Sequence, residues 1–111
     1  MITMKMIMAI VQNIDAETAI NALIDAGYRV TRVATTGGFF HQGNTTFLMG
    51  VSDDQMETVI GILREHCQAR TRLRSVTPDP TGPVPIVGGY LEVKVGGATV
   101  FVFDVEHYEQ F

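Results

Sequence analysis

The sequence predicts an α+β fold, and three observations support this prediction. Short apolar runs alternate with segments of helical periodicity, the order strand, helix, strand occurs twice, and two further strand patterns follow near the end. A length of 111 residues is enough to build one hydrophobic core. We therefore expect residues 1–111 to form a single domain.

The first strand–helix–strand unit occupies residues 5–35. Residues 5–12 form a continuous apolar run, which is typical of a strand covered on both faces. Asn13 to Asp15 offer side chains for a helix N-cap, and Gly27 suits the left-handed position after a helix. The helix between them has apolar residues three and four positions apart, namely Ala16, Ala19, Ile20, Leu23 and Ile24. The β-branched segment 29–35 is the expected second strand.

The second unit repeats this order over residues 45–77. Residues 45–51 are a third strand, and Ser52 with Gln55 has the spacing of a capping box at the start of a helix. The apolar stripe of that helix contains Met56, Val59, Ile60, Leu63 and Cys67. Residues 69–77 are the expected fourth strand, at an edge because they are rich in arginine. Two such units make a split βαβ, the ferredoxin-like βαββαβ arrangement.

The last third of the chain adds a long loop and two strand patterns. All four prolines lie between residues 78 and 85, which predicts a loop. Residues 90–95 alternate apolar and polar side chains, and residues 98–105 are apolar at nearly every position. Because Gly96-Gly97 between them can adopt positive φ twice, we expect a two-residue turn and an additional C-terminal hairpin.

The expected sheet has more apolar surface than the helices can cover. Two helices cover one face of a four-stranded sheet, yet the first, third and last strands are apolar on both faces. The simplest way to bury the second face is to pack it against another copy of the chain, in a closed cyclic oligomer. Ligand pockets commonly form where such copies meet.

Composition excludes several functions. A net charge of −4 and a pI near 5.2 argue against a nucleic-acid polymer as partner. The apolar run near the start is about seven residues long, too short for a membrane span of ~20, so we expect no membrane segment. The single Cys67 excludes an internal disulfide and fits a reducing cytoplasm.

No set of residues points to catalysis or to a bound metal. His41, His66 and His107 have no partner at the spacing of metal ligands, and neither a nucleophile with a base nor a nucleotide-binding glycine motif is present. We therefore expect no enzyme activity, no metal and no cofactor.

Residues 35–44 form a glycine-bracketed loop between two expected strands. Gly37, Gly38 and Gly43 let a ligand approach the main chain, and Phe39 and Phe40 stand where a simple turn would carry small polar residues. Two adjacent rings cannot easily both turn into the core. This pattern leaves two interpretations, a site for a planar ligand or a wide hairpin whose aromatic rings fill a subunit interface.

Three segments in this order resemble the PII-like cyclic di-AMP receptors known as PstA or DarA. They are residues 29–40, with Ala-Thr-Thr-Gly-Gly-Phe at 34–39, residues 43–46, Gly-Asn-Thr-Thr, and residues 96–102, Gly-Gly-Ala-Thr-Val-Phe-Val. The resemblance is nearly full length. It implies a homotrimer of ferredoxin-like subunits that binds cyclic di-AMP in the clefts between neighbours and performs no catalysis.

The resemblance also implies roles for individual residues. Arg29, Val30 and Thr31 are expected at the base of the pocket, Phe39 and Phe40 on the adenine, Asn44 and Gly50 beside it, and Phe101 and Gln110 across the seam. Thr36 and Gly38 complete the expected ligand-binding set. Aromatic rings stack on bases, and hydroxyl and backbone N–H groups suit phosphate oxygens. Gly27, where the family often has asparagine, and Phe40, where leucine is common, depart from the pattern.

Other ligands remain alternatives at this point. A PII-type trimer could sense ATP and 2-oxoglutarate, but such sensors carry a long loop between the second and third strands, and here that connection is short. A copper-tolerance-like trimer would need metal ligands that the sequence lacks. A structural trimer without a ligand is the third alternative. No effector domain is visible, so a signal receptor of this kind would act on a separate, unknown effector protein.

Overall fold

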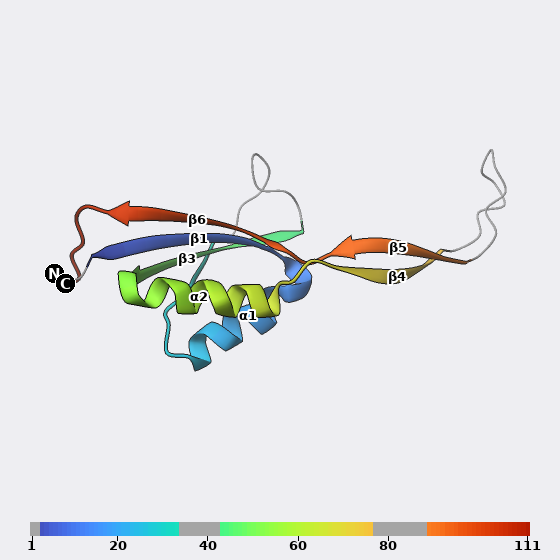
Figure 1. The fold of residues 1–111 in the computed structure, drawn as a ribbon, viewed down its shortest axis with the longest axis horizontal. Coiled ribbons are helices and arrows are strands. Elements are labelled where there is room, and N and C mark those ends of the chain that lie inside the picture. The colour runs from blue at the N-terminus through green and yellow to red at the C-terminus, as the bar shows by residue number, and fades with distance from the viewer. Residues whose placement is uncertain (1–2, 34–42, 77–88) are drawn as a thin grey trace.

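The computed structural model describes residues 3–33, 43–76 and 89–111 (Figure 1). The elements, in order, are β1 (Met4–Gln12), α1 (Asn13–Asp25), β2 (Thr31–Val33), β3 (Asn44–Ser52), α2 (Asp53–His66), β4 (Arg70–Val76), β5 (Gly89–Val95) and β6 (Ala98–Val105). Both helices lie on one side of a four-stranded sheet (Figure 1). The predicted α+β, ferredoxin-like fold class is confirmed.

The main sheet has the strand order β2-β3-β1-β6, with every pair antiparallel. Its fourth strand is therefore β6, and the prediction that residues 69–77 fill this position is wrong. β4 pairs with β5 in a separate two-stranded sheet. The physical reason lies in the side chains. In β6, Val100 and Val102 lie on the helix-covered face, whereas the sequence of β4 is rich in arginine, which is rarely buried in a core.

The predicted hairpin around Gly96-Gly97 is also different. Both glycines have positive φ, +83° and +82°, as expected. However, β5 pairs with β4 and β6 pairs with β1, so the glycines join one sheet to the other instead of turning a hairpin. The additional hairpin is thus the β4–β5 pair, inserted between α2 and the last strand, and it extends away from the helices and the main sheet (Figure 1).

The hydrophobic core lies between the helices and the main sheet. The sheet contributes the inward-facing residues of β1 and β3, such as Ile7, Val11 and Phe47, all buried. The helices contribute most of the predicted stripes, with Leu23 and Leu63 fully buried. The prediction fails at Ile24, which is exposed because α1 turns this position toward solvent.

The helix ends agree with prediction at two points and differ at one. The capping box of α2 is confirmed, since the Ser52 N–H donates to Gln55 Oε1 at 3.2 Å. Gly27 follows the end of α1 with φ +94°, and its N–H donates to the Ile24 carbonyl at 2.9 Å. The prediction of a side-chain cap from Asn13 to Asp15 is wrong, because α1 already begins at Asn13 and its N-cap, Gln12, makes no side-chain cap bond.

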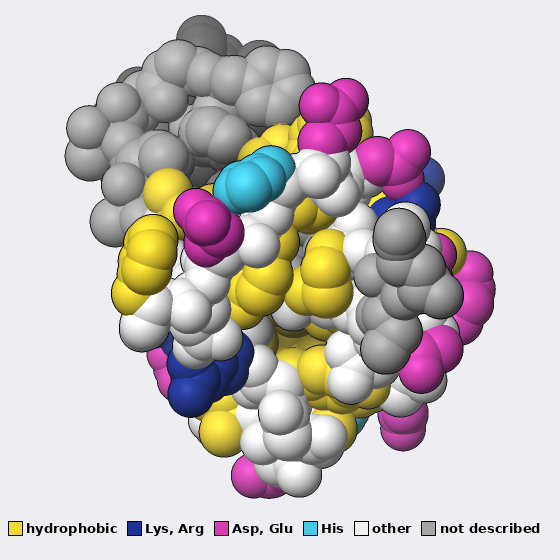
Figure 2. All heavy atoms as spheres, turned by 90° about the vertical axis from the view of Figure 1, so that its left-hand side faces the viewer, with side chains coloured by type: hydrophobic (Ala, Val, Ile, Leu, Met, Phe, Trp, Pro, Cys, Tyr) yellow, Lys and Arg dark blue, Asp and Glu magenta, His cyan; other side chains and the backbone are white. Residues whose placement is uncertain are grey.

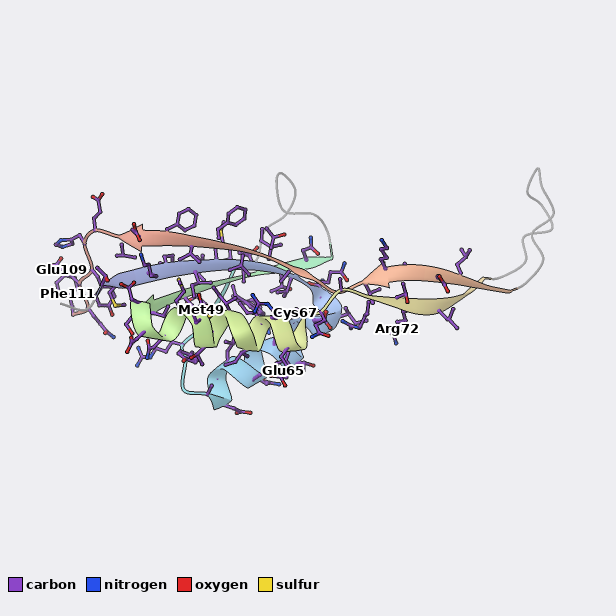
Figure 3. All side chains as sticks on the ribbon, viewed as in Figure 1. Met49, Glu65, Cys67, Arg72, Glu109 and Phe111 are labelled. Carbon is purple, nitrogen blue, oxygen red and sulfur yellow. The ribbon has the colours of Figure 1, made fainter. Side chains whose placement is uncertain are left out.

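The face of the main sheet opposite the helices is apolar, as predicted. Met6, Met8 and Leu48 lie on it, together with Phe101 and Phe103, which are 37% and 49% exposed. Aromatic rings project from β6 on this side (Figure 3). None of the helices and strands described in the structure packs on it. We call it the open face.

Candidate ligand site

Seven of the eleven predicted ligand-binding residues lie in the described part of the chain. These are Arg29, Val30, Thr31, Asn44, Gly50, Phe101 and Gln110. The other four, Thr36, Gly38, Phe39 and Phe40, lie outside the described residues. Arg29, Val30, Thr31 and Asn44 lie on the two sides of the segment 34–42 in the sequence, and the other three lie on β3, on β6 and in the C-terminal tail.

Thr31 and Phe101 lie on one row that crosses the whole open face. Thr31 pairs with Leu48, Leu48 with Met8, and Met8 with Phe101, so the four side chains share a face and a level. β2 and β6 are the two edges of this sheet. Three inter-strand steps separate them, which amounts to about 14 Å. One chain thus presents Thr31 and Phe101 at opposite edges.

The remaining predicted residues are also spread over the sheet. Asn44 pairs with Gln12 at one end of β3, and Gly50 pairs with Met6 near the other end, about 20 Å away by strand rise. Gln110 lies in the tail after β6, between the labelled Glu109 and Phe111, at the end where β1 begins (Figure 3). Its Oε1 accepts a hydrogen bond from the Tyr108 hydroxyl at 3.0 Å. A single chain does not bring the predicted set together.

Arg29 and Val30 directly precede β2. Val30 is half-buried and packs against the core, which fixes the backbone at this point. Arg29 is exposed, and within the described residues it makes no ion pair, whereas Arg32 pairs with Glu17 at 2.7 Å. Arg29 is therefore an exposed cation just before β2 that is available to an anionic group.

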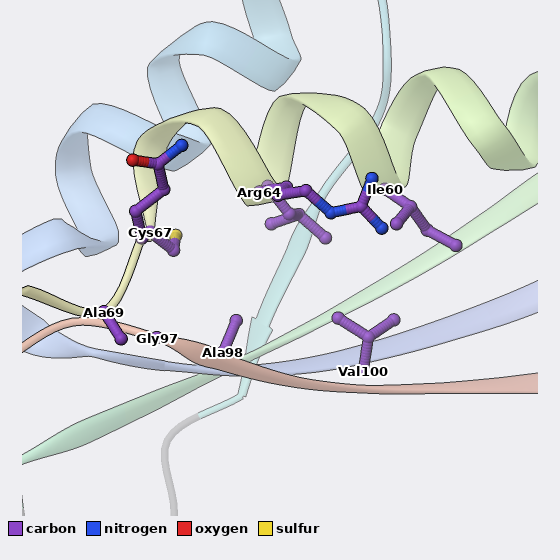
Figure 4. Close-up of a pocket in the computed structure, with 9 residues that line it drawn as sticks. Ile60, Arg64, Cys67, Ala69, Gly97, Ala98 and Val100 are labelled. Carbon is purple, nitrogen blue, oxygen red and sulfur yellow. The ribbon is translucent and has the colours of Figure 1, made fainter.

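Asn44 lines a hollow of about 280 Å³ on the open face. The other lining residues are Ile10, Gln12, Gly96, Gly97, Ala98 and Thr99. A larger hollow of about 480 Å³ lies between α2 and β6, where Arg64, Cys67 and Val100 face one another (Figure 4). The larger hollow lies on the helix side and contains none of the predicted residues, so the smaller one is the better candidate for part of the site.

The corner between β1 and α1 holds Gly43 and Thr45 at the start of β3. The sequence pattern does not predict these contacts. The Asn13 N–H donates to the Gly43 carbonyl at 2.8 Å, and the Thr45 hydroxyl donates to Asn13 Oδ1 at 2.5 Å. The side chain of Gln12 accepts a hydrogen bond from the Gly96 N–H at 2.6 Å. The available signal is the change from apolar to amide side chains at Gln12-Asn13, where the sequence pattern predicts only a strand end and a helix cap.

The described residues contain no cluster of histidine, cysteine, aspartate or glutamate that could hold a metal ion. Burial raises the pKa of the Cys67 thiol to about 11, with the Asp15 carboxylate as a second cause, so the thiol is protonated and a poor nucleophile at neutral pH. None of the described helices is long and apolar enough to cross a membrane.

Comparisons with known proteins identify the family and the fold of the chain. Residues 4–111 match the model of a family described as cyclic-di-AMP receptor. The fold is also similar to the crystal structure of a functionally unknown protein from Pediococcus pentosaceus ATCC 25745. That protein is 36% identical, with a TM-score of 0.76, and the match covers 98% of each chain.

Proposed function

Since the chain belongs to the cyclic di-AMP receptor family, we propose that it is a non-enzymatic signal receptor that binds cyclic di-AMP. The match over residues 4–111 is the observation that carries this proposal. The receptor is a single ligand-binding domain that works without metal or cofactor and signals from the cytoplasm to a separate effector protein.

We further propose that the ligand lies in clefts between the subunits of a homotrimer. The position of Thr31 and Phe101 at opposite edges of one sheet supports this arrangement. Two copies that meet edge to edge would place Thr31 of one beside Phe101 of the next. A contact of this kind is heterologous, and its repetition closes a ring of three when neighbouring copies are related by a threefold rotation. The apolar open face gives the ring a hydrophobic interior.

The chemistry of the residues fits a cyclic dinucleotide. The Thr31 hydroxyl and the Arg29 guanidinium suit phosphate oxygens, while the Asn44 amide can read a base edge. Phe39, Phe40 and, from a neighbouring subunit, Phe101 supply rings that can contact adenine. Stacking of this kind contributes about 1–3 kcal/mol per base.

Calorimetric titration of the purified protein with cyclic di-AMP, cyclic di-GMP and ATP tests the proposal. We expect cyclic di-AMP to bind at least tenfold more tightly than cyclic di-GMP, because one or two hydrogen bonds to a base edge are worth roughly 1–3 kcal/mol. Equal affinities would refute base reading, and a preference for ATP would identify a PII-type sensor instead. Light scattering should give three times the 12.2 kDa mass of the chain, and a monomer mass would sink the cleft arrangement.

A pair of variants on β6 tests the role of Phe101. Phe101→Ala should weaken cyclic di-AMP binding about tenfold, which corresponds to the lower part of the stacking range. Phe103→Ala is the matched control, because its ring lies on the same face with its centroid 6.5 Å from that of Phe101 but has no predicted ligand contact. If both variants weaken binding equally, the effect is one of subunit packing and not of ligand contact.

A further inference from the structure

The β4–β5 pair forms a ribbon, residues 70–76 and 89–95, with two exposed leucines. Leu73 and Leu91 are 66% and 60% exposed. A two-stranded hairpin is marginally stable by itself in water. Apart from contacts at its base, where Arg70 binds Asp15, none of the described elements packs on this ribbon. The ribbon therefore presents apolar side chains that none of the other described elements covers.

The ribbon has the opposite charge to the rest of the chain. Its strands carry four cationic residues and one acidic residue, a net charge of +3. The rest of the chain carries four cationic and eleven acidic residues, a net charge of −7. In the end view, acidic side chains are spread around the margin of the body and basic ones are few (Figure 2). The charge separation makes the ribbon the attractive surface for an acidic partner.

The outer edge of β4 combines these properties in an alternating pattern. Arg72 lies opposite Val93 on one face of the ribbon, and Leu73 lies opposite Glu92 on the other. Arg70 and Arg72 occupy alternate positions on the same face. Among the described strands, β4 pairs only with β5, so its outer row of backbone N–H and C=O groups is open to another strand.

We propose that the outer edge of β4 docks an extended segment of a partner protein in which acidic and apolar residues alternate. Added as a third strand, such a segment would place its acidic side chains beside Arg72 and its apolar ones beside Leu73. The backbone hydrogen bonds favour a polypeptide over a nucleic acid or a lipid surface. An extended polyanion would also be repelled by the acidic residues in the rest of the chain. This docking is independent of the binding of cyclic di-AMP.

The probe is a fluorescent eight-residue peptide that alternates glutamate with valine, titrated by anisotropy against the full chain without cyclic di-AMP. A lysine–valine peptide of the same length is the control for charge. We expect the glutamate peptide to bind, more weakly as salt is raised, and the lysine peptide not to bind. Arg72→Glu should weaken binding about tenfold, because it replaces attraction with repulsion. Leu73→Ser should also weaken it severalfold.

Matched controls lie on the helices. Arg64→Glu makes the same charge change on α2, and Ile24→Ser removes an exposed apolar side chain from α1. Both should leave the peptide affinity unchanged within twofold. Amide exchange of β4 and β5 shows whether the Arg72 and Leu73 variants keep the ribbon folded. In the wild-type complex, additional amides of β4 should become protected.

Several results would overturn the proposal. One is the absence of peptide binding at millimolar concentration, and another is equal affinity for the ribbon variants and the controls. Tighter binding of an RNA oligonucleotide or of phosphatidylserine vesicles, lost in Arg72→Glu, would assign the ribbon to a different class of partner. A change of oligomeric mass in Arg72→Glu or Leu73→Ser would identify the surface as a contact between copies of this chain. None of these results depends on whether cyclic di-AMP binds.

Discussion

The ion pair between Asp15 and Arg70 fixes the ribbon to the body, and its removal makes the most specific stability prediction. Arg70 Nη2 and Nη1 donate to the two carboxylate oxygens of Asp15 at 2.8 and 3.1 Å. The Asp15 side chain is 7% exposed, whereas that of Arg70 is 43% exposed. Arg70 Nη1 also donates to the Gln68 carbonyl at 3.0 Å. The pair thus joins the first turn of α1 to the first residue of β4.

We expect Arg70→Gln to lower the free energy of unfolding by about 2 kcal/mol. A hydrogen bond to a charged group contributes ~1.5–3 kcal/mol, and its loss leaves the Asp15 side chain, which is 7% exposed, without its cationic partner. Two such bonds join Arg70 to Asp15. Because the Arg70 guanidinium is partly exposed, solvent screening weakens both, and we expect their combined contribution to be about that of a single bond. Asp15→Asn should cost a similar amount.

Urea denaturation of the two single variants and the double variant measures the coupling. The double variant should be more stable than the sum of the single losses predicts, by ~1 kcal/mol or more, since both remove the same interaction. Arg72→Gln is the matched control, because Arg72 lies on the same face of β4 without an ion pair in the described residues. Amide exchange in β4 and β5 should accelerate only in the Arg70 and Asp15 variants. Additive losses, or unchanged exchange in the ribbon, would refute this explanation of how the ribbon is held.

Two further predictions concern Gly96 and Cys67. Gly96→Ala should destabilise the protein by about 1–3 kcal/mol in urea denaturation, because φ is +83° and the new Cβ would overlap the Gln68 carbonyl oxygen. The control is Gly61→Ala on α2, where the new Cβ lies in open space, and it should stabilise the protein by ~0.5–1 kcal/mol. Equal effects would contradict the assigned backbone conformation. For Cys67, the pKa in the folded state, about 11, lies above the ordinary value of 9.0. The contribution of the protonated thiol to the free energy of unfolding is therefore complete below pH 9 and is lost as the pH rises through 11. Between pH 8 and 10, the free energy of unfolding should fall by about 1 kcal/mol less in Cys67→Ala than in the wild type. Parallel pH profiles for wild type and variant would show that the thiol does not titrate in this way.

Much of the fold follows from local patterns in the sequence. The helices, β1 and β3 were predicted nearly to their ends, because each has a clear apolar period and recognisable flanking residues such as Gly27 and Ser52. Strand partners were less predictable. The positive φ of Gly96 and Gly97 is a local requirement of their sequence, but it does not say which strands they join. The arginines of residues 70–74 indicated an edge strand, but they did not show that it belongs to a separate sheet.

The candidate site was predictable as a list of residues but not as an arrangement. The resemblance identified Thr31 and Phe101, and only the pairing register places them at opposite edges of one sheet. The sequence pattern assigns Asn13 to helix capping, because an amide side chain next to a helix start usually has that role, and it assigns Gln12 to the end of the first strand. Their contacts with Gly43 and Gly96 involve residues far apart in the sequence, which no local pattern reports.

The pairing of β1 with β6 affects how the protein is made. β1 is a central strand, and one of its two neighbours, β6, is translated after every other element described. Until Ala98–Val105 leaves the ribosome, one edge of β1 has no partner, and its Met and Ile side chains have no strand beside them on that side. Contacts between such distant residues slow folding, and an unpaired apolar edge promotes aggregation. A nascent chain released before Ala98 should therefore aggregate, whereas one released after Val105 should fold.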